Sequence, residues 1–468
     1  MEHDKLHEEC GLIGIWTDQH HAIGEKLYDG LISLQHRGQE SAGIAVNQYG
    51  QIVQYKNVGL VNEVFDEDRI NSLAGSLGVG HVRYSTTGRP DRRNAQPLVT
   101  TFKGGQMALA HNGNLVNAKQ LRDELIDDGY TFETALDTEV ITRLIAKLYQ
   151  GDMAETIQQV CSVVQGAYAL VLMVGEVLYG IRDPYGLRPL VLGKTPEGEW
   201  VLASETATLD LLGADLIRDL AKGEIVEIKQ GEMRSWMFDD TKPQAFCSFE
   251  FVYFARPDSI VEGKTVLSVR KQLGAILASY DDDTYDLVAP VPDSGIAAAI
   301  GYSHAAKIPY TTVLMKNKYI GRTFLNPTQE QRDRALRLKL NVQREEVFGK
   351  RIVLVDDSIV RGTTMKKLIH QLKAAGAKEV HVRISSPPVI HACHFGIDTP
   401  TNKSLIGAQM THAEICRHIG ADSLKFLEIR DMLRATGMEK ALCKACFDGK
   451  YPMAVPKTAD KFVFEKEI

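Results

Sequence analysis

Residues 351 to 364, RIVLVDDSIVRGTT, combine an apolar run with two acids and a glycine-containing turn. The apolar run predicts a buried strand, and the residues that follow have a helical pattern. Backbone N–H groups at a helix N-terminus bind phosphate, and the hydroxyls of Thr363 and Thr364 add donors. Asp356 and Asp357, at the carboxyl end of the strand, can accept hydrogen bonds from a ribose diol or approach magnesium. The pattern therefore predicts a site for a phosphorylated sugar.

Other interpretations of these residues are structural. Paired acids after a strand often only cap the next helix. Upstream, the segment from Lys316 to Arg344 holds eight Lys or Arg residues against two acids, which suits a small polyanion. A solvated basic face is the alternative for any one of these cations.

The chain has seven cysteines without regular spacing, which argues against a disulfide scaffold and leaves catalysis or metal binding. Cys10 alone would be read as a small buried hydrophobe as readily as a nucleophile. The pair Cys443 and Cys446 could bind zinc or do redox chemistry, and with Cys247 and Cys393 it makes four thiolates, enough for zinc or an iron–sulfur cluster. Two further cysteines fall in apolar-periodic helical stretches and are expected to be packing residues: Cys161 and Cys416.

Length and composition limit the possible classes of protein. A chain of 468 residues is too long for one ordinary core, so two domains are expected. The net charge of -6 disfavours a nucleic-acid binder. No apolar run approaches the roughly 20 residues of a membrane span. The first nine residues, MEHDKLHEE, are acidic and lack the apolar core of a secretory signal, so we expect a cytoplasmic protein.

The first half of the chain contains many short apolar runs separated by Gly-rich turns, with helical patterns around residues 22 to 36 and 117 to 165. This mixture predicts an α+β domain of antiparallel sheets with segregated helices. The stretch GEIVEIKQGEMRSWMF is typical of a hairpin with Gly231 at its turn, and a polar, Pro-containing boundary follows near residue 240.

The second half has a different pattern. Continuous apolar runs (DLVAPVP, YTTVLMK, RIVLVDD and EVHVRISSP) alternate with helical stretches at 295 to 307 and 363 to 376. Such alternation predicts βαβ units and a parallel α/β sheet. After about residue 400 the pattern is again helical and polar.

At residues 351 to 364 the chain resembles the type I phosphoribosyltransferases, and the resemblance spans roughly residues 280 to 400. It implies phosphoribosyl pyrophosphate (PRPP) as substrate, with magnesium held at Asp356, Asp357 and the hydroxyl of Ser294 in PVPDSG. KNKYIGRTF, residues 316 to 324, resembles a loop that closes over PRPP. The implied PRPP-binding residues are Asp356, Asp357, Ser358, Arg361, Gly362, Thr363, Thr364, Lys318, Tyr319, Arg322 and Lys339.

The segments CGLIGIW, HRGQESAG, HVRYST, HNGNL and LDTE together resemble a class II glutamine amidotransferase of the N-terminal nucleophile (Ntn) hydrolase type, over residues 10 to about 240. In that chemistry a thiolate attacks the amide carbonyl, and the α-amino group of the same residue serves as the base. Cys10 must then be the first residue, so the resemblance implies that residues 1 to 9 are a removable propeptide.

The same resemblance assigns roles within the glutaminase. Asn112 and the Gly113 N–H would form an oxyanion hole, while Arg83 would bind the glutamine carboxylate and Asp137 its ammonium group. Gly38 is expected to let the backbone approach the nucleophile closely, with a helix-ending glycine as the equal alternative.

A glutaminase followed by a PRPP site resembles the glutamine PRPP amidotransferase family over nearly the whole chain. The family implies ammonia transfer to PRPP as the first committed step of purine synthesis, with feedback by AMP, GMP, ADP and GDP and a homotetrameric assembly. The contexts of the four cysteines resemble the propeptide-bearing branch, whose members hold a structural 4Fe–4S cluster at Cys247, Cys393, Cys443 and Cys446. The expected domains are a glutaminase at 10 to 240 and a transferase at 241 to 468 with a helical, cluster-binding tail.

Two other functions are weighed against this interpretation. A glucosamine-phosphate or asparagine synthetase would need a different second domain, to which residues 351 to 364 do not correspond. A PRPP-sensing regulator without turnover is disfavoured by the acidic charge and by the full set of glutaminase motifs.

Overall fold

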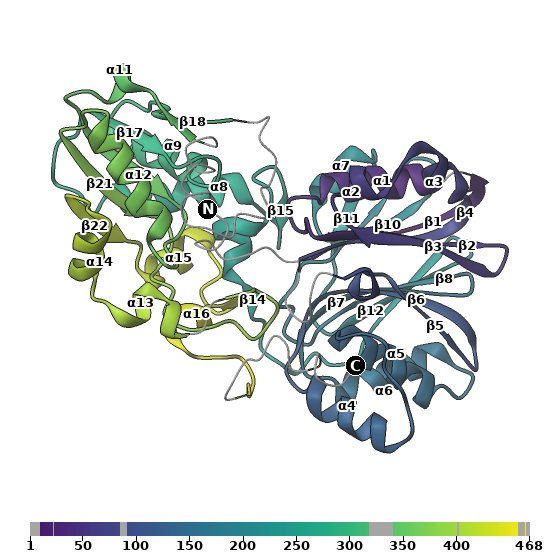
Figure 1. Ribbon diagram of the computed structural model, residues 1–468. Helices are drawn as coiled ribbons and strands as arrows, with labels where there is room; N and C mark the ends of the chain where they lie inside the picture. Colours follow the sequence, from purple (N-terminus) through teal and green to yellow (C-terminus); the bar gives the residue numbers. More distant parts are fainter. Residues whose placement is uncertain are drawn as a thin grey trace.

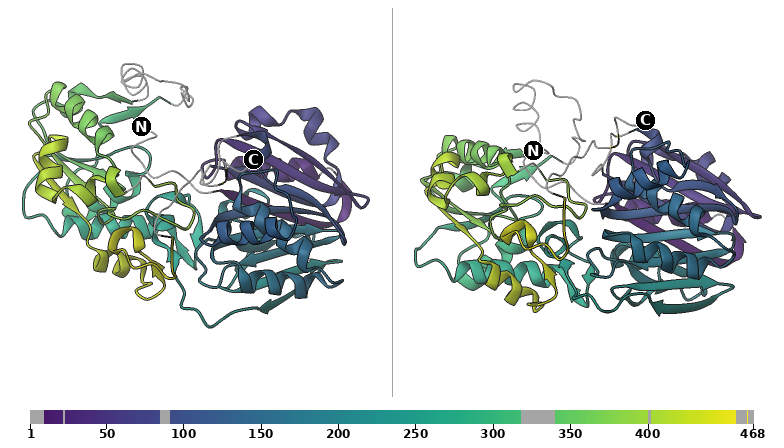
Figure 2. Two further views of the ribbon diagram at one scale, coloured as in Figure 1. Left: turned by 60° about the horizontal axis from the view of Figure 1, so that its bottom comes forward. Right: turned by 90° about the horizontal axis from the view of Figure 1, so that it is seen from below.

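The computed structural model describes residues 10–21, 23–84, 91–317, 340–399, 402–456 and 464. Figure 1 shows two parts side by side, and the two further views in Figure 2 keep them apart. Strands up to Met237 build a two-sheet sandwich, and a parallel sheet begins at Leu287.

The first sheet of the sandwich has seven strands, and every pairing in it is antiparallel. Their spatial order is β11 (Asp215–Asp219), β9 (Val191–Lys194), β10 (Trp200–Ala203), β1 (Gly11–His21), β4 (Gly75–Arg83), β2 (Ser41–Gln48) and β3 (Gln51–Val58). Its outer face carries α1 (Ile23–Ser33), α2 (Val61–Val64), α3 (Glu67–Ser72) and α7 (Thr206–Leu211) (Figure 1).

The second sheet has six antiparallel strands. Their order is β13 (Glu232–Met237), β12 (Glu224–Lys229), β8 (Val177–Arg182), β7 (Gly166–Val174), β6 (Gly105–Leu115) and β5 (Leu98–Phe102). The outer face of this sheet is covered by α4 (Ala118–Asp127), α5 (Asp137–Leu148) and α6 (Met153–Val163) (Figure 1). A short 3-10 helix, Arg92–Asn94, precedes β5.

Side-chain alternation explains this four-layer arrangement. In β1, Ile13 and Ile15 pack under the α1 layer, whereas Leu12 points into the core between the sheets. In β6, Leu109 packs against the helices and Ala108 faces the first sheet. Because successive side chains point to opposite faces and both faces are buried, strands such as β7 and β10 are apolar at almost every position. The α+β prediction for this half is confirmed.

The second part contains a four-stranded parallel sheet in the order β17 (Leu287–Pro290), β20 (Arg351–Asp356), β21 (Glu379–Ile384) and β22 (Ser423–Phe426). One face packs on α8 (Val266–Ala278), α9 (Ile296–Ala306) and α15 (Ile429–Thr436), and the other on α12 (Thr363–Ala374) and α14 (His412–Ile419). The predicted α/β domain with a parallel sheet is confirmed.

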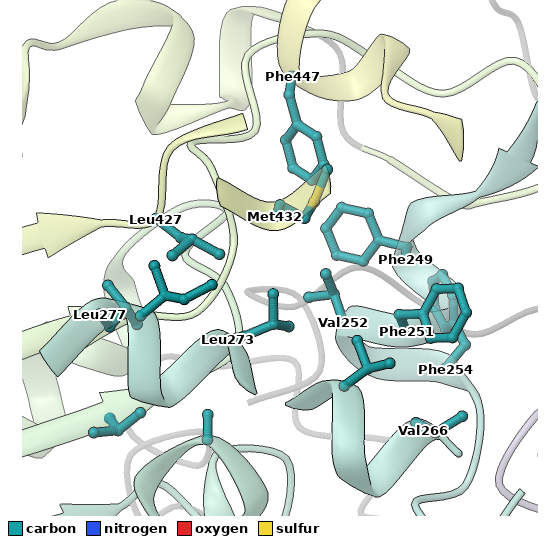
Figure 3. Close-up of a cluster of buried hydrophobic side chains, with 14 of the residues drawn as sticks. Phe249, Phe251, Val252, Phe254, Val266, Leu273, Leu277, Leu427, Met432 and Phe447 are labelled. Carbon is teal, nitrogen blue, oxygen red and sulfur yellow. The ribbon is translucent and has the colours of Figure 1, made fainter. Parts of the chain in front are cut away.

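Each face of the parallel sheet belongs to its own hydrophobic core. The larger core, on the side of α8, also contains the segment that joins the sandwich to the sheet. Phe249, Phe251 and Phe254, around a π-helical turn at Glu250–Phe254, pack with Leu273 of α8 and with Phe447 near the C-terminus (Figure 3). Phe249 and Phe447 stack with ring centroids 5.5 Å apart. The joining segment is therefore part of a core and not a free linker.

Shorter elements complete the described chain. They are β14 (Phe246–Cys247) with β23 (Leu442–Cys443), β15 (Ile260–Val261) with β16 (Lys264–Thr265), β18 (Leu314–Lys316) with β19 (Leu340–Val342), α11 (Arg344–Val347), a 3-10 turn at Asn402–Ser404, α13 (Ile406–Gln409) and α16 (Ala445–Asp448). None of the described helices is long and apolar enough to cross a membrane.

Three expectations need correction. YTTVLMK is not a strand of the parallel sheet, because only an isolated parallel bridge from Tyr310 to Val288 joins it to the sheet and β18 pairs antiparallel with β19. The helical stretch at 117 to 165 is three separate helices. Strand β22, in the region expected to be helical, was missed because SLKF is half-polar at a sheet edge.

Other local predictions hold. The hairpin β12–β13 turns at Gln230 and Gly231, which both have positive φ, as a type I′ turn requires. The helices predicted at 295 to 307 and 363 to 376 correspond to α9 and α12. Cys161 is buried in α6, and Cys416 lies partly buried in α14.

Candidate active sites

Cys10 lies at the start of β1, where β1 pairs with the end of β4. Its side chain is 6% exposed, and its Sγ is 3.8 Å from the carbonyl oxygen of Tyr84. Burial raises the pKa of the Cys10 thiol to about 11, against the opposing charge of Arg83. The sulfur is therefore a thiol at neutral pH in this geometry, and nucleophilic attack needs a base.

Two charged groups flank this thiol. Arg83, at the end of β4, and Asp137, at the first position of α5, are both buried and both act electrostatically on Cys10. The carboxylate of Asp137 accepts a hydrogen bond from Leu115 N–H at 2.9 Å, which fixes its orientation. A buried cation and a buried anion beside one nucleophile match the two charged ends of an α-amino acid.

Strand β6 carries Asn112 and Gly113 and contacts Asp137 through Leu115. The N–H groups of His111 and Leu115 donate to the side chains of Gln96 and Asp137, at 2.8 and 2.9 Å. Since successive N–H groups of a strand point to opposite edges, the N–H of Gly113 faces the same side as these two. The buried Nδ2 of Asn112 has no hydrogen-bond acceptor among the described residues. Asn112 and Gly113 can thus offer two donors from adjacent residues to a ligand oxygen.

Gly38 lies close to the backbone of β4, whereas the sequence predicted a close approach to the nucleophile. A Cβ at this position would lie 2.5 Å from both Arg83 N and Val82 C. The loop after α1 can therefore pack against the end of β4, next to Cys10, only with glycine at this position.

Arg37, in the HRGQESAG motif, received no role from the sequence. Its fully buried guanidinium binds Glu205 at 2.6 Å and Glu250 at 2.6 Å, and its Nε donates to the carbonyl oxygen of Cys10 at 3.2 Å. Although burial opposes it, the two carboxylates hold the pKa of Arg37 above its usual range. The partners lie 168 and 213 residues away, so no local sequence pattern identifies them.

The second candidate site lies at the carboxyl ends of β17 and β20. Asp356 ends β20, and the hydroxyl of Ser294 stands 3.4 Å from its Oδ1. Asp357 follows and accepts the hydroxyl of Ser358 at 2.6 Å. Gly295 has no space for a Cβ, which would collide with the carbonyl oxygen of Val355. These contacts bring PVPDSG and the DDS sequence together, as oxygen ligands for a hard cation require.

The phosphate-binding pattern is also present. Gly362 adopts φ of 79° at the N-cap of α12, and Thr363 and Thr364 form the first turn. Arg361 and Thr363 are exposed, while Thr364 is buried at the base of the turn. The turn can present N–H groups and hydroxyls to an anion. Four predicted PRPP contacts lie outside the described residues: Lys318, Tyr319, Arg322 and Lys339. The predicted propeptide, residues 1 to 9, lies outside them as well.

The four expected cluster cysteines line one cavity. Cys247, Cys393, Cys443 and Cys446 line this cavity together with Leu187, Arg188, Phe395 and Tyr451. All four are free thiols, and strands β14 and β23 pair Cys247 directly with Cys443. Burial raises the pKa of Cys247 and of Cys443 to about 12. No group of three or more His, Cys, Asp or Glu side chains in the described ranges is arranged to hold one metal ion.

Comparison with known proteins relates both sites to one family. Residues 81–210 match the model of a glutamine amidotransferase domain, and residues 259–385 match that of a phosphoribosyl transferase domain. The amidophosphoribosyltransferase of Synechococcus elongatus is 47% identical, over 97% of this chain and 93% of that protein. The enzyme of Bacillus subtilis is 44% identical, over 96% and 95%.

A solved structure is similar throughout. It is the glutamine PRPP amidotransferase of Bacillus subtilis in complex with ADP and GMP, with 43% identity and a TM-score of 0.90. The likeness covers 96% of this chain and 98% of that one. The arrangement of the two parts is therefore that of the relative as well.

Proposed function

Because the chain belongs to the amidophosphoribosyltransferase family, we propose that Cys10 releases ammonia from glutamine and that PRPP bound beside Asp356 and Asp357 accepts it. The enzyme catalyses the first committed step of purine nucleotide synthesis. Glutamine, PRPP and water give 5-phosphoribosylamine, glutamate and pyrophosphate. The observation that carries the assignment of residues is the buried thiol of Cys10 near the buried charges of Arg83 and Asp137. Residues 10–240 are assigned to the glutaminase and 241–468 to the transferase.

The nucleophile is activated by its own α-amino group. A thiol whose pKa is about 11 carries little thiolate at neutral pH, whereas an α-amino group has an ordinary pKa of about 8. Removal of residues 1–9 as a propeptide would free this amine next to the sulfur, where it can take the thiol proton. The same proton can then be delivered to the departing ammonia.

The neighbouring side chains bind and polarise glutamine. Arg83 takes the α-carboxylate and Asp137 the ammonium group, through charge-assisted hydrogen bonds. The Asn112 amide and the Gly113 N–H stabilise the oxyanion, and each such donor is typically worth about 100- to 1,000-fold in rate. The Nδ2 of Asn112, which has no acceptor within the described part of the chain, supports this role. Gly38 permits the close packing beside them.

At the second site the protein positions PRPP. Asp356 and Asp357 accept from the ribose hydroxyls, and with Ser294 they would hold Mg²⁺. When bound, this ion neutralises pyrophosphate charge in the transition state. The turn from Ser358 to Thr364 binds the 5-phosphate, using Arg361, Gly362 and Thr363. The pyrophosphate is assigned to Lys318, Tyr319, Arg322 and Lys339. Ammonia is already nucleophilic, so orientation and charge dominate over base catalysis.

Cys247, Cys393, Cys443 and Cys446 are assigned as ligands of a 4Fe–4S cluster. The four thiols line one pocket, yet no three of the described His, Cys, Asp and Glu side chains are arranged around one metal ion, which supports this choice over a single zinc ion with four sulfurs about 2.3 Å from one centre. A cluster takes one thiolate on each iron and so suits sulfurs spread around a larger space. Its role is structural, joining the segment at β14 to the C-terminal part at β23.

Further properties follow from the family assignment. The partners are the substrates glutamine and PRPP, together with AMP, GMP, ADP and GDP as feedback inhibitors. We assign a homotetramer as the working state and the cytoplasm as the location, with neither nucleic acid nor a membrane as a partner.

The central experiment separates the two half-reactions. Cys10→Ala should reduce glutamine-driven pyrophosphate release to background, because no other nucleophile is assigned. Ammonia-driven release should stay within about twofold of the unsubstituted enzyme, since the second site is unchanged. Both rates are measured with the same pyrophosphate assay. If glutamine still drives the reaction after this substitution, the assignment of Cys10 is wrong.

A second measurement tests the propeptide and the cluster. Active enzyme purified without oxygen should begin at Cys10 by N-terminal sequencing and should contain about four irons per chain. An intact Met1 in fully active enzyme would contradict the role of the α-amino group. Stoichiometric zinc in place of iron would contradict the cluster.

A further inference from the structure

A loop of the transferase part lies directly on the strand that carries Asn112 and Gly113. The Nδ2 of Asn114, next in this strand, donates to the carbonyl oxygen of His394 at 3.0 Å. Gly396 has φ of 108°, and a Cβ there would lie 3.0 Å from both Cα and C of Gly113. The loop from Cys393 to Ile397 therefore approaches the glutaminase site at backbone distance.

Residues of the sandwich also bind and pack against this loop. Arg188, with no exposed surface, donates from Nε to the carbonyl oxygen of Phe395 at 3.0 Å and from Nη2 to the same atom. The Phe395 ring is 2% exposed and packs with Ala167 of β7 and Leu187. Buried hydrogen bonds and close packing on both sides fix the loop in one position.

Gly113 needs such a support. Its φ is 145°, a conformation that glycine tolerates and other residues rarely adopt. On the side of β7, any Cβ at position 113 would collide with the carbonyl oxygen of Ala167, so this side is packed to contact. Gly396 supplies a second close approach to the Gly113 backbone. A residue as free as glycine keeps one orientation of its N–H when close contacts hold its backbone.

We propose that Asn114 and Gly396 are positioning residues for the oxyanion hole, so that the transferase part sets the geometry of the glutaminase reaction. The inference rests on the proposed roles of Asn112 and Gly113. A displacement of about 1 Å at a catalytic group can cost about 100-fold in rate, which makes a contact at this distance consequential. The loop begins at Cys393, whose Sγ accepts a hydrogen bond from Phe395 N–H at 3.3 Å.

Gly396→Ala tests the close approach. The added methyl group would lie 3.0 Å from the Gly113 backbone and 3.1 Å from Arg188 Nη2, so these contacts must give by a few tenths of an ångström. Glutamine-driven turnover should fall about 10- to 100-fold in kcat with little change in the KM for glutamine. Ammonia-driven turnover and iron content should stay within about twofold. The matched control is Gly151→Ala, at a glycine of similar φ (116°) with open space around it, which carries the backbone strain without the contact.

Asn114→Ala tests the inference even if Gly396→Ala fails to fold. It removes the donor to His394 and adds no bulk, and we expect about a tenfold loss of glutamine-driven kcat with ammonia-driven turnover retained. The alkylation rate of Cys10 by iodoacetamide should be unchanged, because the nucleophile is not altered. Equal losses with both nitrogen sources, slower alkylation, or unchanged glutamine-driven turnover in Asn114→Ala would each overturn the inference.

Asn112→Ala separates a failure of this inference from a failure of the proposed function. If that substitution leaves glutamine-driven turnover intact, the oxyanion hole itself is assigned wrongly. If Asn112→Ala abolishes this turnover while Asn114→Ala and Gly396→Ala do not affect it, the oxyanion assignment stands and only the supporting role of the loop is rejected.

Discussion

The two candidate sites differ in how deeply their residues are buried. At the glutaminase site Cys10, Arg83 and Asp137 are at most 6% exposed and contact core strands. At the PRPP site the two acids are buried, whereas Arg361 and Thr363 of the phosphate turn are exposed. Groups inside a core contribute to stability and chemistry together, and groups on a loop contribute mainly to chemistry. Substitutions at the first site should therefore change the free energy of unfolding more than those at the phosphate turn.

The largest effect is expected at the buried arginine of the glutaminase. Arg37→Met leaves Glu205 and Glu250 buried without their shared cation, and breaking a buried ion pair from one side costs about 3–5 kcal/mol. Glutamine-driven turnover should fall as well, because the donor to the Cys10 carbonyl is lost. Urea unfolding followed by circular dichroism measures the stability change.

The control for this substitution is Arg234→Met, which removes an arginine whose side chain is 74% exposed in a surface pair with Glu232. Its cost should stay below about 0.5 kcal/mol. Equal costs for Arg37→Met and Arg234→Met would remove the distinction between buried and exposed charges on which the comparison rests.

An intermediate, pH-dependent effect is expected at His81, which lies in β4 two residues before Arg83. Burial lowers the pKa of His81 to about 3, with Arg83 adding to the effect. Its Nε2 contacts the carbonyl oxygen of His111, and its buried Nδ1 has no partner among the described residues. A proton on Nδ1 would therefore place an unpaired charge in the core.

The direction of the pH effect follows from this depressed pKa. The unfolded chain binds a proton below about pH 6.5 and the folded chain does not, so the stability from neutral His81 is present above pH 6.5 and is lost as the pH falls toward 3. Between pH 7 and pH 5 the loss is about 2 kcal/mol. His81→Gln cannot titrate and should show a correspondingly shallower fall in urea stability. An unchanged slope in this variant would contradict the assignment.

Local signals made part of both sites predictable. The order of apolar strand, two acids, Gly362 and Thr363 is contiguous, so the sequence alone indicates a strand, a turn and a helix. The same holds for the hairpin at Gly231, whose turn type depends on two neighbouring residues. The ligand set of four cysteines was predicted by resemblance, and the shared cavity brings those residues together.

Contacts between distant segments were not predictable in this way. Arg37 meets Glu250 across 213 residues, and Asn114 meets His394 across 280. A buried ion pair or a side chain bonded to a remote carbonyl leaves no periodic signal, because each partner satisfies the local pattern of its own strand or loop. The half-polar edge strand β22 was missed for a related reason, since its pairing with β21 outweighs its weak local preference.

The smallest change in stability is expected at the phosphate turn. Thr363→Ala removes an exposed hydroxyl at the start of α12, so the free energy of unfolding should change by less than about 0.5 kcal/mol. Loss of one hydrogen bond to a charged phosphate costs about 1.5–3 kcal/mol, which predicts at least a tenfold lower kcat/KM for PRPP. The loss should be equal with glutamine and with ammonia, because both use the same PRPP. A loss confined to glutamine would place Thr363 in the coupling between the sites and not in phosphate binding.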